Sequence, residues 1–142
     1  MFFNLDKWVG HISENAMKQI TDAFGRRLQN SGITRVQWIA LYYVKTKSKI
    51  SQRDLSNLMN IMDSSAGRLI DRLERDGLIE RERNNTDRRV IYINLTDKGD
   101  KLITDLLPIG IQFNDDLIAG IDEKELMIYE KVLNKMISNM KK

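Results

Sequence analysis

The chain has 142 residues, a net charge of +3, 42% hydrophobic residues and 30% charged residues, which is typical of one soluble globular domain. Cysteine is absent and His11 is the only histidine. This composition excludes disulfides, thiolate zinc sites, cysteine nucleophiles and histidine-rich metal cages, and we expect neither a metal nor another cofactor. The sequence shows no signal segment and no run of about 18 apolar residues, so we expect a cytoplasmic protein that does not associate with a membrane.

Residues 5–30 carry apolar side chains at the spacing of one helical face, which predicts a long first helix. Gly32 interrupts this pattern and marks the end of the helix. Thr34, with Gln37 three residues later, forms a capping-box sequence that predicts where a second helix begins. The chain is therefore expected to open with two helices joined by a short connection.

Two shorter helices are expected next. Ser51 and Asp54 repeat the capping-box spacing and predict the start of a third helix. After a brief turn at residues 60–62, Asp63 or a neighbour is expected to cap a fourth helix, which Gly77 ends as a C-cap glycine. Two such helices joined by a tight turn are typical of a helix-turn-helix motif.

The apolar period then changes from that of a helix to that of a strand. Residues 78–81 and 90–95 predict two paired strands, and residues 84–88 have the composition of a turn. A hairpin that directly follows a helix-turn-helix predicts a wing. Thr96 is then expected to cap a long helix, and the pair Asp122 and Glu125 predicts the start of a final helix.

The predicted fold is therefore mainly α with a small β-hairpin wing. We expect a single domain over residues 1–142, with the winged helix-turn-helix at about 34–98. Long N- and C-terminal helices at about 5–30 and 99–140 are expected to flank it.

Most of the arginines lie between residues 53 and 89, where their forked side chains suit phosphates and guanine edges. Carboxylates interleave with them, so a solvated face of ion pairs explains the charges equally well. The motif favours DNA, because its second helix can enter the major groove and present its N-terminal residues to base edges. We expect base contacts from Ser64, Ser65, Gly67 and Arg68, and phosphate contacts from Arg72, Arg75, Ser51, Gln52 and Arg53.

The predicted turn of the hairpin carries Asp87, Arg88 and Arg89. An arginine held out on a turn suits the narrow, electronegative minor groove of duplex DNA. Asp87 can accept its N–H bonds and fix its direction. The alternative interpretation of these residues is a surface hairpin stabilised by salt bridges. For residues 51–75, the alternative is a helical hairpin with an exposed charged face.

The run from Leu55 through Gly99 resembles the MarR family, the multiple-antibiotic-resistance regulators. The matching segments are RLIDRLERDGLI at 68–79, DRR at 87–89 and NLTDKG at 94–99. The resemblance implies a sequence-specific regulator of transcription that binds double-stranded DNA as a homodimer, and a repressor acting on a pseudo-palindromic operator. By position, Arg89 is similar to the family's minor-groove arginine and Asp87 to its partner, whereas Gly67 stands where the family more often has serine or threonine.

The resemblance also implies that the first and last helices build the dimer. These helices carry more apolar positions than one small DNA-binding unit could cover. Packing within one chain remains the alternative for any single position. The expected seam consists of Leu126, Leu133, Met136 and Met140, with Trp8 and Ile12 opposite.

Family members often bind small aromatic anions, so we expect a small aromatic or phenolic ligand that releases the protein from DNA. Candidate ligand-binding residues offer stacking surfaces and polar anchors. Aromatic residues at helical spacing more often belong to a core, which is the alternative. The candidates are Trp8, His11, Asn15, Arg35, Trp38 and Tyr42.

Two other functions compete with DNA binding. A winged-helix adaptor would use the same surface for a protein partner, but such a surface has no evident use for the exposed arginines Arg68 and Arg89. An enzyme is disfavoured, because the sequence shows no carboxylate pair, no nucleophile-base set and no phosphate-binding glycine loop.

Overall fold

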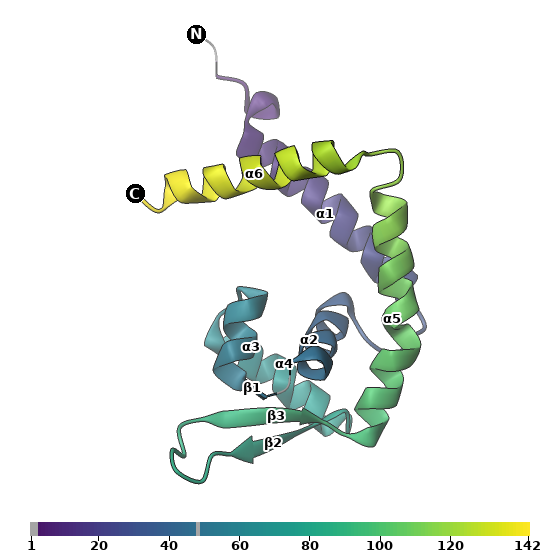
Figure 1. Ribbon diagram of the computed structural model, residues 1–142, viewed down its shortest axis with the longest axis vertical. Coiled ribbons are helices and arrows are strands. Elements are labelled where there is room, and N and C mark those ends of the chain that lie inside the picture. Colours follow the sequence, from purple (N-terminus) through teal and green to yellow (C-terminus); the bar gives the residue numbers. More distant parts are fainter. Residues whose placement is uncertain (1–2, 48) are drawn as a thin grey trace. The chain divides into compact units, whose positions relative to one another are not determined.

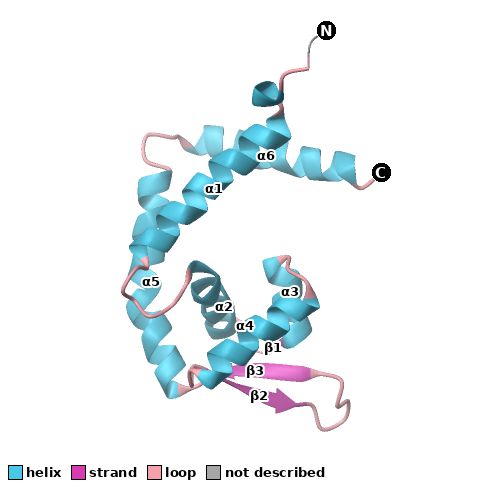
Figure 2. Ribbon diagram, turned by 180° about the vertical axis from the view of Figure 1, so that it is seen from behind, coloured by secondary structure: helices cyan, strands magenta, loops and turns pink. Residues whose placement is uncertain are grey.

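The structure is a computed structural model that describes residues 3–47 and 49–142, and the chain divides into two compact units, Met1–Gly110 and Ile111–Lys142. The helix α5 crosses the boundary between them. The elements of the first unit are the 3₁₀ helix η1 (Leu5–Lys7), α1 (Val9–Arg27), α2 (Arg35–Thr46), β1 (Ile50–Ser51), α3 (Gln52–Met59), α4 (Asp63–Arg75), β2 (Ile79–Arg83), β3 (Ile91–Leu95) and the beginning of α5 (Asp97–Leu117). The second unit contains the end of α5 and α6 (Glu123–Met140). The predicted class, mainly α with a small sheet, is confirmed (Figures 1 and 2).

Capping boxes start three of the helices where the sequence predicts them. Thr34 accepts a hydrogen bond from the backbone N–H of Gln37, whose side chain accepts one from the backbone of Thr34. Ser51 and Asp54 do the same at α3, and Asp122 and Glu125 at α6. These pairs satisfy backbone donors that the helix itself leaves free.

The first predicted helix is shorter than expected. Asn4 caps the 3₁₀ turn η1, Trp8 has an extended backbone, and only then does α1 begin at Val9. The fourth helix also starts differently, because Met62 precedes α4 without a capping hydrogen bond from its side chain. Asp63 instead accepts a hydrogen bond of 2.8 Å from the hydroxyl of Ser56 on α3.

The wing belongs to a three-stranded antiparallel sheet rather than a two-stranded one. Its strand order is β1-β3-β2, with Ile50 opposite Ile93 and Arg81 also opposite Ile93 on the other side. The sequence does not predict β1, because a strand of two residues is too short to show a period. The helices α2, α3 and α4 lie on one side of this sheet, and the β2–β3 hairpin extends beyond them (Figures 1 and 2).

The core lies between the sheet and the helices α2 to α5. Leu41, Leu55, Ile70, Leu73 and Ile103 are fully buried in it. On α4 the buried positions Ala66, Ile70 and Leu73 recur at helical spacing, so the opposite face of α4 is left to solvent. This packing fixes which side chains α4 presents outward.

One junction joins the end of α4, the start of β2 and the start of α5. Gly77 has a left-handed backbone (φ 75°), and the N–H of Leu78 closes the turn on the carbonyl oxygen of Leu73 at 2.9 Å. The hydroxyl of Thr96 donates to the carbonyl oxygen of Gly77 and accepts from the N–H of Gly99. A Cβ at Gly99 would lie 1.9 Å from the carbonyl oxygen of Leu78, so only glycine fits there.

Candidate nucleic-acid interface

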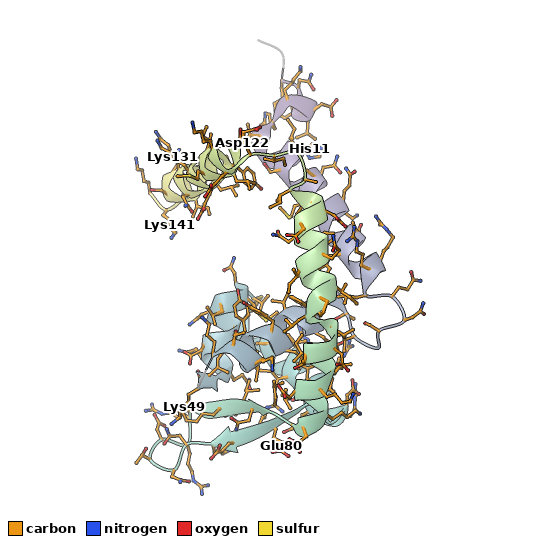
Figure 3. The ribbon with its side chains drawn as sticks, turned by 45° about the vertical axis from the view of Figure 1, so that its right-hand side comes forward. His11, Lys49, Glu80, Asp122, Lys131 and Lys141 are labelled. Carbon is orange, nitrogen blue, oxygen red and sulfur yellow. The ribbon has the colours of Figure 1, made fainter. Side chains whose placement is uncertain are left out.

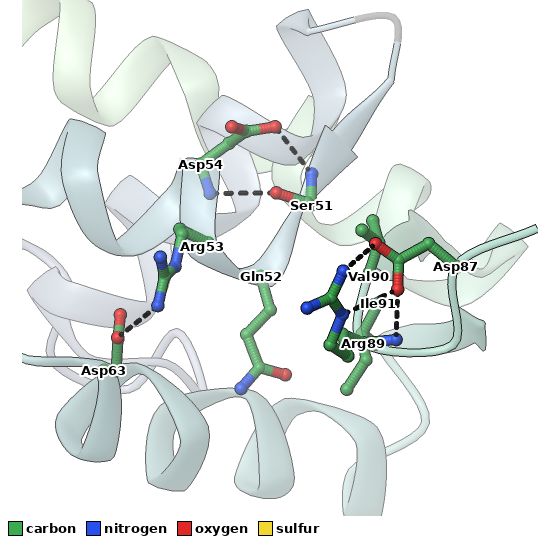
Figure 4. A pocket seen from close by; sticks show the side chains of 9 residues that line it. All are labelled: Ser51, Gln52, Arg53, Asp54, Asp63, Asp87, Arg89, Val90 and Ile91. Carbon is green, nitrogen blue, oxygen red and sulfur yellow. Dashed lines mark hydrogen bonds and ion pairs between the residues drawn. The ribbon is translucent and has the colours of Figure 1, made fainter. Parts of the chain in front are cut away.

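A groove of about 540 Å³ lies between the start of α3, the start of α4 and the wing. It brings together five of the residues that the sequence analysis selected, from segments more than 30 positions apart along the chain (Figure 4). The lining residues are Ser51, Gln52, Arg53, Asp54, Asp63, Asp87, Arg89, Val90 and Ile91.

Asp63 connects the two helices of the motif, α3 and α4, at one wall of this groove. One carboxylate oxygen accepts from the buried hydroxyl of Ser56, and the other lies 3.5 Å from the guanidinium of Arg53 (Figure 4). Asn60 closes the turn between the helices with a left-handed backbone (φ 53°), which asparagine tolerates well. The start of α4 is thus fixed relative to α3.

One row of exposed residues on α4 is polar and positively charged, beside the exposed carboxylates of Asp71 and Glu74 that pair with Arg81. Ser64, Arg68, Arg72 and Arg75 are exposed and recur at helical spacing, opposite the buried face. Ser65 and Gly67 are half-buried at the edges of this face, and the guanidinium of Arg68 lies 3.4 Å from the hydroxyl of Ser65. All the α4 residues selected from the sequence therefore reach the surface.

The tip of the wing is an ordered turn. The side-chain oxygen of Asn84 accepts hydrogen bonds from the backbone of Thr86 and Asp87, and the N–H of Asn84 donates to the carbonyl of Val90 at 3.0 Å. Arg83 donates to the carbonyl oxygen of Arg88 at 2.9 Å. These bonds give the tip a defined conformation although most of it is exposed.

Asp87 orients Arg89 at this tip. Its carboxylate accepts the backbone N–H of Arg89 at 3.0 Å and the Nε and Nη2 donors of the same residue at 3.1 and 3.2 Å (Figure 4). The Arg89 side chain is nevertheless 91% exposed. Hydrogen bonds from the side chain and then from the backbone N–H of Arg89 hold the pKa of the Asp87 carboxyl below its usual value.

Arg81 is a residue of this region to which the sequence analysis gave no role. Its guanidinium lies 2.7 Å from Asp71 and 3.1 Å from Glu74, and it also donates to the carbonyl oxygen of Gly67 and to Gln52. Only 23% of its side chain is exposed. The sequence could have indicated this position through the alternation of β2. Arg81 lies two residues after the buried Ile79, so both side chains are on the face of the strand that points toward the helices.

The six candidate ligand residues fall into separate places. His11 and Asn15 line a shallow pocket on the exposed N-terminal part of α1, whereas Trp8 packs edge-on against Phe3 (Figure 3 labels His11). Trp38 and Tyr42 stack on each other in α2, where Trp38 also meets Phe24 of α1. Because His11 and Phe24 are thirteen positions apart on one helix, about 20 Å lies between these two places.

Trp38 already has a structural role. Its indole N–H donates to the carbonyl oxygen of Leu106 at 3.0 Å, and a Cβ on Gly110 would lie 2.3 Å from its ring. Arg35, the first residue of α2, is half-buried. Within one chain, the structure therefore does not gather the six candidates around a common cavity.

Comparison with known proteins gives the family. A sequence model of the MarR family matches residues 31–90. The HTH-type transcriptional regulator YsmB of Bacillus subtilis is 29% identical over 140 residues, which cover 98% of this chain and 92% of YsmB. The HTH-type transcriptional regulator BilQ of Clostridium symbiosum is 30% identical over 98 residues, which cover 69% of this chain and 68% of BilQ.

Solved structures show the same fold. BpsR of Bordetella bronchiseptica, whose DNA binding is regulated by 6-hydroxynicotinic acid, has a TM-score of 0.86 at 22% identity, with 96% of this chain and 97% of BpsR covered. S. aureus MepR in complex with DNA has a TM-score of 0.85 at 23% identity, with 93% of this chain and 98% of MepR covered.

Within the described residues, no helix has both the length and the apolar character that crossing a bilayer requires. Proteins of the matched family regulate transcription and are not enzymes. From the family match, the related regulators and the shared fold, the chain belongs to the MarR family of winged helix-turn-helix, DNA-binding transcriptional regulators.

Proposed function

We propose that the chain is a cytoplasmic, sequence-specific repressor that binds a pseudo-palindromic operator as a homodimer and is released by a small aromatic ligand. The observation that carries this proposal is the groove shared by α3, α4 and the wing. Because its walls come from all three elements, each can touch the same duplex at once.

The outer face of α4 is the proposed reader of the major groove. A helix fits this groove, which is about 12 Å wide, with its N-terminal residues toward the base edges. Ser64, Ser65, Gly67 and Arg68 occupy that part of α4, and the forked guanidinium of Arg68 suits guanine. Arg72 and Arg75 follow one and two turns later, where they would bind phosphates.

Two further contacts to the duplex are proposed beside α4. The free backbone N–H groups of Gln52 and Arg53 at the start of α3 would bind a phosphate beside Ser51, whose own N–H already donates to Asp54. Arg89, held outward by Asp87, would enter the minor groove, and Arg88 would contact the adjacent backbone. All these contacts except the base readers should depend on salt more than on sequence.

Apolar residues left exposed on the terminal helices support a homodimer. On α6, Met127, Ile128, Tyr129, Val132, Ile137 and Met140 are exposed, whereas the predicted seam residues Leu126, Leu133 and Met136 are half-buried (Figure 3 labels Lys131 of the same helix). A helix with one exposed apolar face needs a partner. On α1 and the segment before it, the exposed large apolar residues are Phe3, Leu5, Trp8, Val9, Ile12 and Met17.

A second copy of the chain is the partner that we propose for these faces. A twofold dimer would place two α4 helices on successive turns of one DNA face, with half-sites ~34 Å apart. The operator would then be an inverted repeat. Binding there would block access of the polymerase to the promoter.

Release by a small aromatic ligand is supported by BpsR, which is regulated by 6-hydroxynicotinic acid. His11, Asn15 and Trp8 lie on the exposed part of α1 that a second chain would cover, so a pocket there would be completed only in the dimer. Arg35, Trp38 and Tyr42 lie on α2, where Trp38 meets Phe24 about 20 Å along α1 from His11, so they would form a second, separate site rather than bind the same small ligand. A ligand regulates only if it prefers one separation of the two α4 helices.

Selection of bound duplexes from a random pool tests the proposal. The purified protein should enrich an inverted repeat with half-sites about one helical turn apart, and its affinity should fall as salt increases. Repeating the selection with phenolic acids should reduce recovery of the operator. A protein that stays monomeric and enriches no duplex at low salt would contradict the proposal.

A further inference from the structure

Gln52 is the first residue of α3, but its side chain extends across the groove onto α4 (Figure 4). Its amide oxygen accepts a hydrogen bond of 3.3 Å from Nε of Arg81. Its amide nitrogen lies 3.7 Å from the position that a Cβ of Gly67 would occupy. The amide of Gln52 therefore lies against the surface of α4 beside Gly67.

The chemistry of Arg81 fixes which way this amide points. A guanidinium only donates hydrogen bonds, so the amide atom that faces Arg81 has to be the oxygen. Arg81 is itself held by Asp71 at 2.7 Å, Glu74 at 3.1 Å and the carbonyl oxygen of Gly67 at 3.3 Å. The oxygen of Gln52 is therefore occupied by an immobilised partner.

The nitrogen of the same amide is left available. Within residues 3–47 and 49–142 it donates no hydrogen bond, and Gln52 is one of the residues that line the groove. The groove wall thus carries two N–H donors that make no hydrogen bond to the described residues, beside an oxygen that is turned toward Arg81 and has one of its two acceptor positions occupied by it. This polarity differs from that of an unconstrained glutamine, which offers a donor and an acceptor side by side.

We propose that Gln52 is a specificity-determining residue of the DNA interface and that Arg81 restricts it to reading hydrogen-bond acceptors. This proposal rests on the DNA binding proposed above. An unconstrained glutamine pairs with adenine, because it accepts from N6 and donates to N7. With its oxygen held by Arg81, Gln52 matches guanine instead, whose N7 and O6 are two adjacent acceptors. Arg81 acts here as a positioning residue that does not itself touch the base.

The experiment compares base preferences of four proteins: wild type, Gln52→Glu, Arg81→Met and Glu74→Gln. Each is used for selection from a random duplex pool, and affinities are then measured on the selected operator and on the operator with guanine replaced by adenine at the contacted position. Wild type should prefer guanine by about tenfold, the size expected of a good base contact. The position is identified as the one whose preference changes in Gln52→Glu.

The two variants should change this preference in different ways. In Gln52→Glu the carboxylate still accepts from Arg81 but presents an oxygen to the base, so the preference for guanine should disappear. In Arg81→Met the amide oxygen becomes free, so the preference should move toward adenine. Glu74→Gln removes one ion pair of Arg81 while leaving its bond to Gln52, and it should keep the wild-type preference.

Thermal unfolding of each variant identifies any general loss of fold, and Gln52→Glu suffices for the test if Arg81→Met does not fold. If Gln52→Glu selects the same DNA sequence as wild type, the inference is overturned. An equal loss of affinity on every duplex would also overturn it, because that is the behaviour of a phosphate contact. If wild type itself binds no duplex, the proposed function fails, whereas a wild-type operator with an indifferent Gln52 leaves that function intact.

Discussion

Arg89 is held by three hydrogen bonds to a single carboxylate, yet most of its side chain faces solvent. An arginine that is exposed but already oriented loses less conformational entropy when it binds than a free one does. For this reason we expect Arg89 to contribute more to affinity than the other charged residues of the wing, including Arg88.

Substitution Arg89→Ala should weaken operator binding by about 1–3 kcal/mol, because it removes the proposed minor-groove contact. Gel-shift titration at fixed salt measures the loss, and sedimentation should show that the dimer is intact. Arg26→Ala removes the same charge from the end of α1 and serves as the matched control. Equal affinities for Arg89→Ala and wild type would remove the wing from the interface.

The carboxyl of Asp87 should titrate below the usual aspartate range, and in Arg89→Ala its pKa should return toward the ordinary value. Because the pKa is lower in the folded chain, the stabilisation exists above the unfolded pKa and disappears as pH falls through the folded one. The orientation of Arg89 should therefore persist at neutral and mildly acidic pH. Carbon NMR titration of the Asp87 carboxyl measures both values; identical curves for the two proteins would contradict the assignment.

At the scale of the helices, α4 has two kinds of outward residue. Its first turns carry small polar side chains and Arg68, whereas Arg72 and Arg75 lie toward its end. Contacts to phosphates are insensitive to base sequence but release counterions, so the two kinds can be separated by their dependence on salt.

Arg72→Ala should lower affinity about equally for all duplexes, and the slope of log affinity against log salt should become shallower by about one. Fluorescence titrations at several salt concentrations, on the operator and on an unrelated duplex, provide the measurement. A loss confined to the operator would instead assign Arg72 to base reading.

The junction between α4 and α5 gives a prediction for stability. Gly99→Ala should lower the free energy of unfolding by about 1–3 kcal/mol, since the new methyl group meets the backbone of Leu78. Denaturant unfolding followed by circular dichroism checks this. Gly25→Ala, in α1 with nothing within 4 Å, should instead raise stability by about 0.5–1 kcal/mol. A Gly99→Ala protein as stable as wild type would show that the junction can relax.

Helix starts could be predicted from the sequence because capping is local. Each of the boxes at Thr34, Ser51 and Asp122 needs only a partner three residues later. The groove could be predicted in part, since its wing and helix residues follow from the motif. The bond between Arg81 and Gln52 could not, because it joins residues 29 positions apart whose meeting depends on how β2 packs on α4.

For the whole molecule, the exposed apolar residues of the terminal helices indicate that a second chain is needed to bury them. Met140 is 81% exposed, and the exposed apolar residues of α6 other than Met127 lie on one broad face. Such a face is costly in water and is the expected mark of an interface between chains. We therefore expect that DNA binding and the proposed dimer can be altered separately.

Val132→Glu should convert the dimer to a monomer, because it places a charge in the proposed apolar interface. Sedimentation equilibrium measures the mass, and operator affinity should fall strongly since a monomer holds one half-site only. Lys131→Glu places the same residue one position away, outside the apolar face, and should leave the dimer intact. A Val132→Glu protein with wild-type mass would exclude this part of α6 from the interface.

The junction at Gly77 and Thr96 has a mechanical consequence. The hydroxyl of Thr96, the ammonium of Lys98 and the close approach of Gly99 to Leu78 tie the first turn of α5 to the last turn of α4. If α5 tilts at this point, we expect the end of α4 to move with it as part of the same rigid unit. In the proposed dimer, a small tilt of α5 in each chain would therefore change the distance between the two α4 helices.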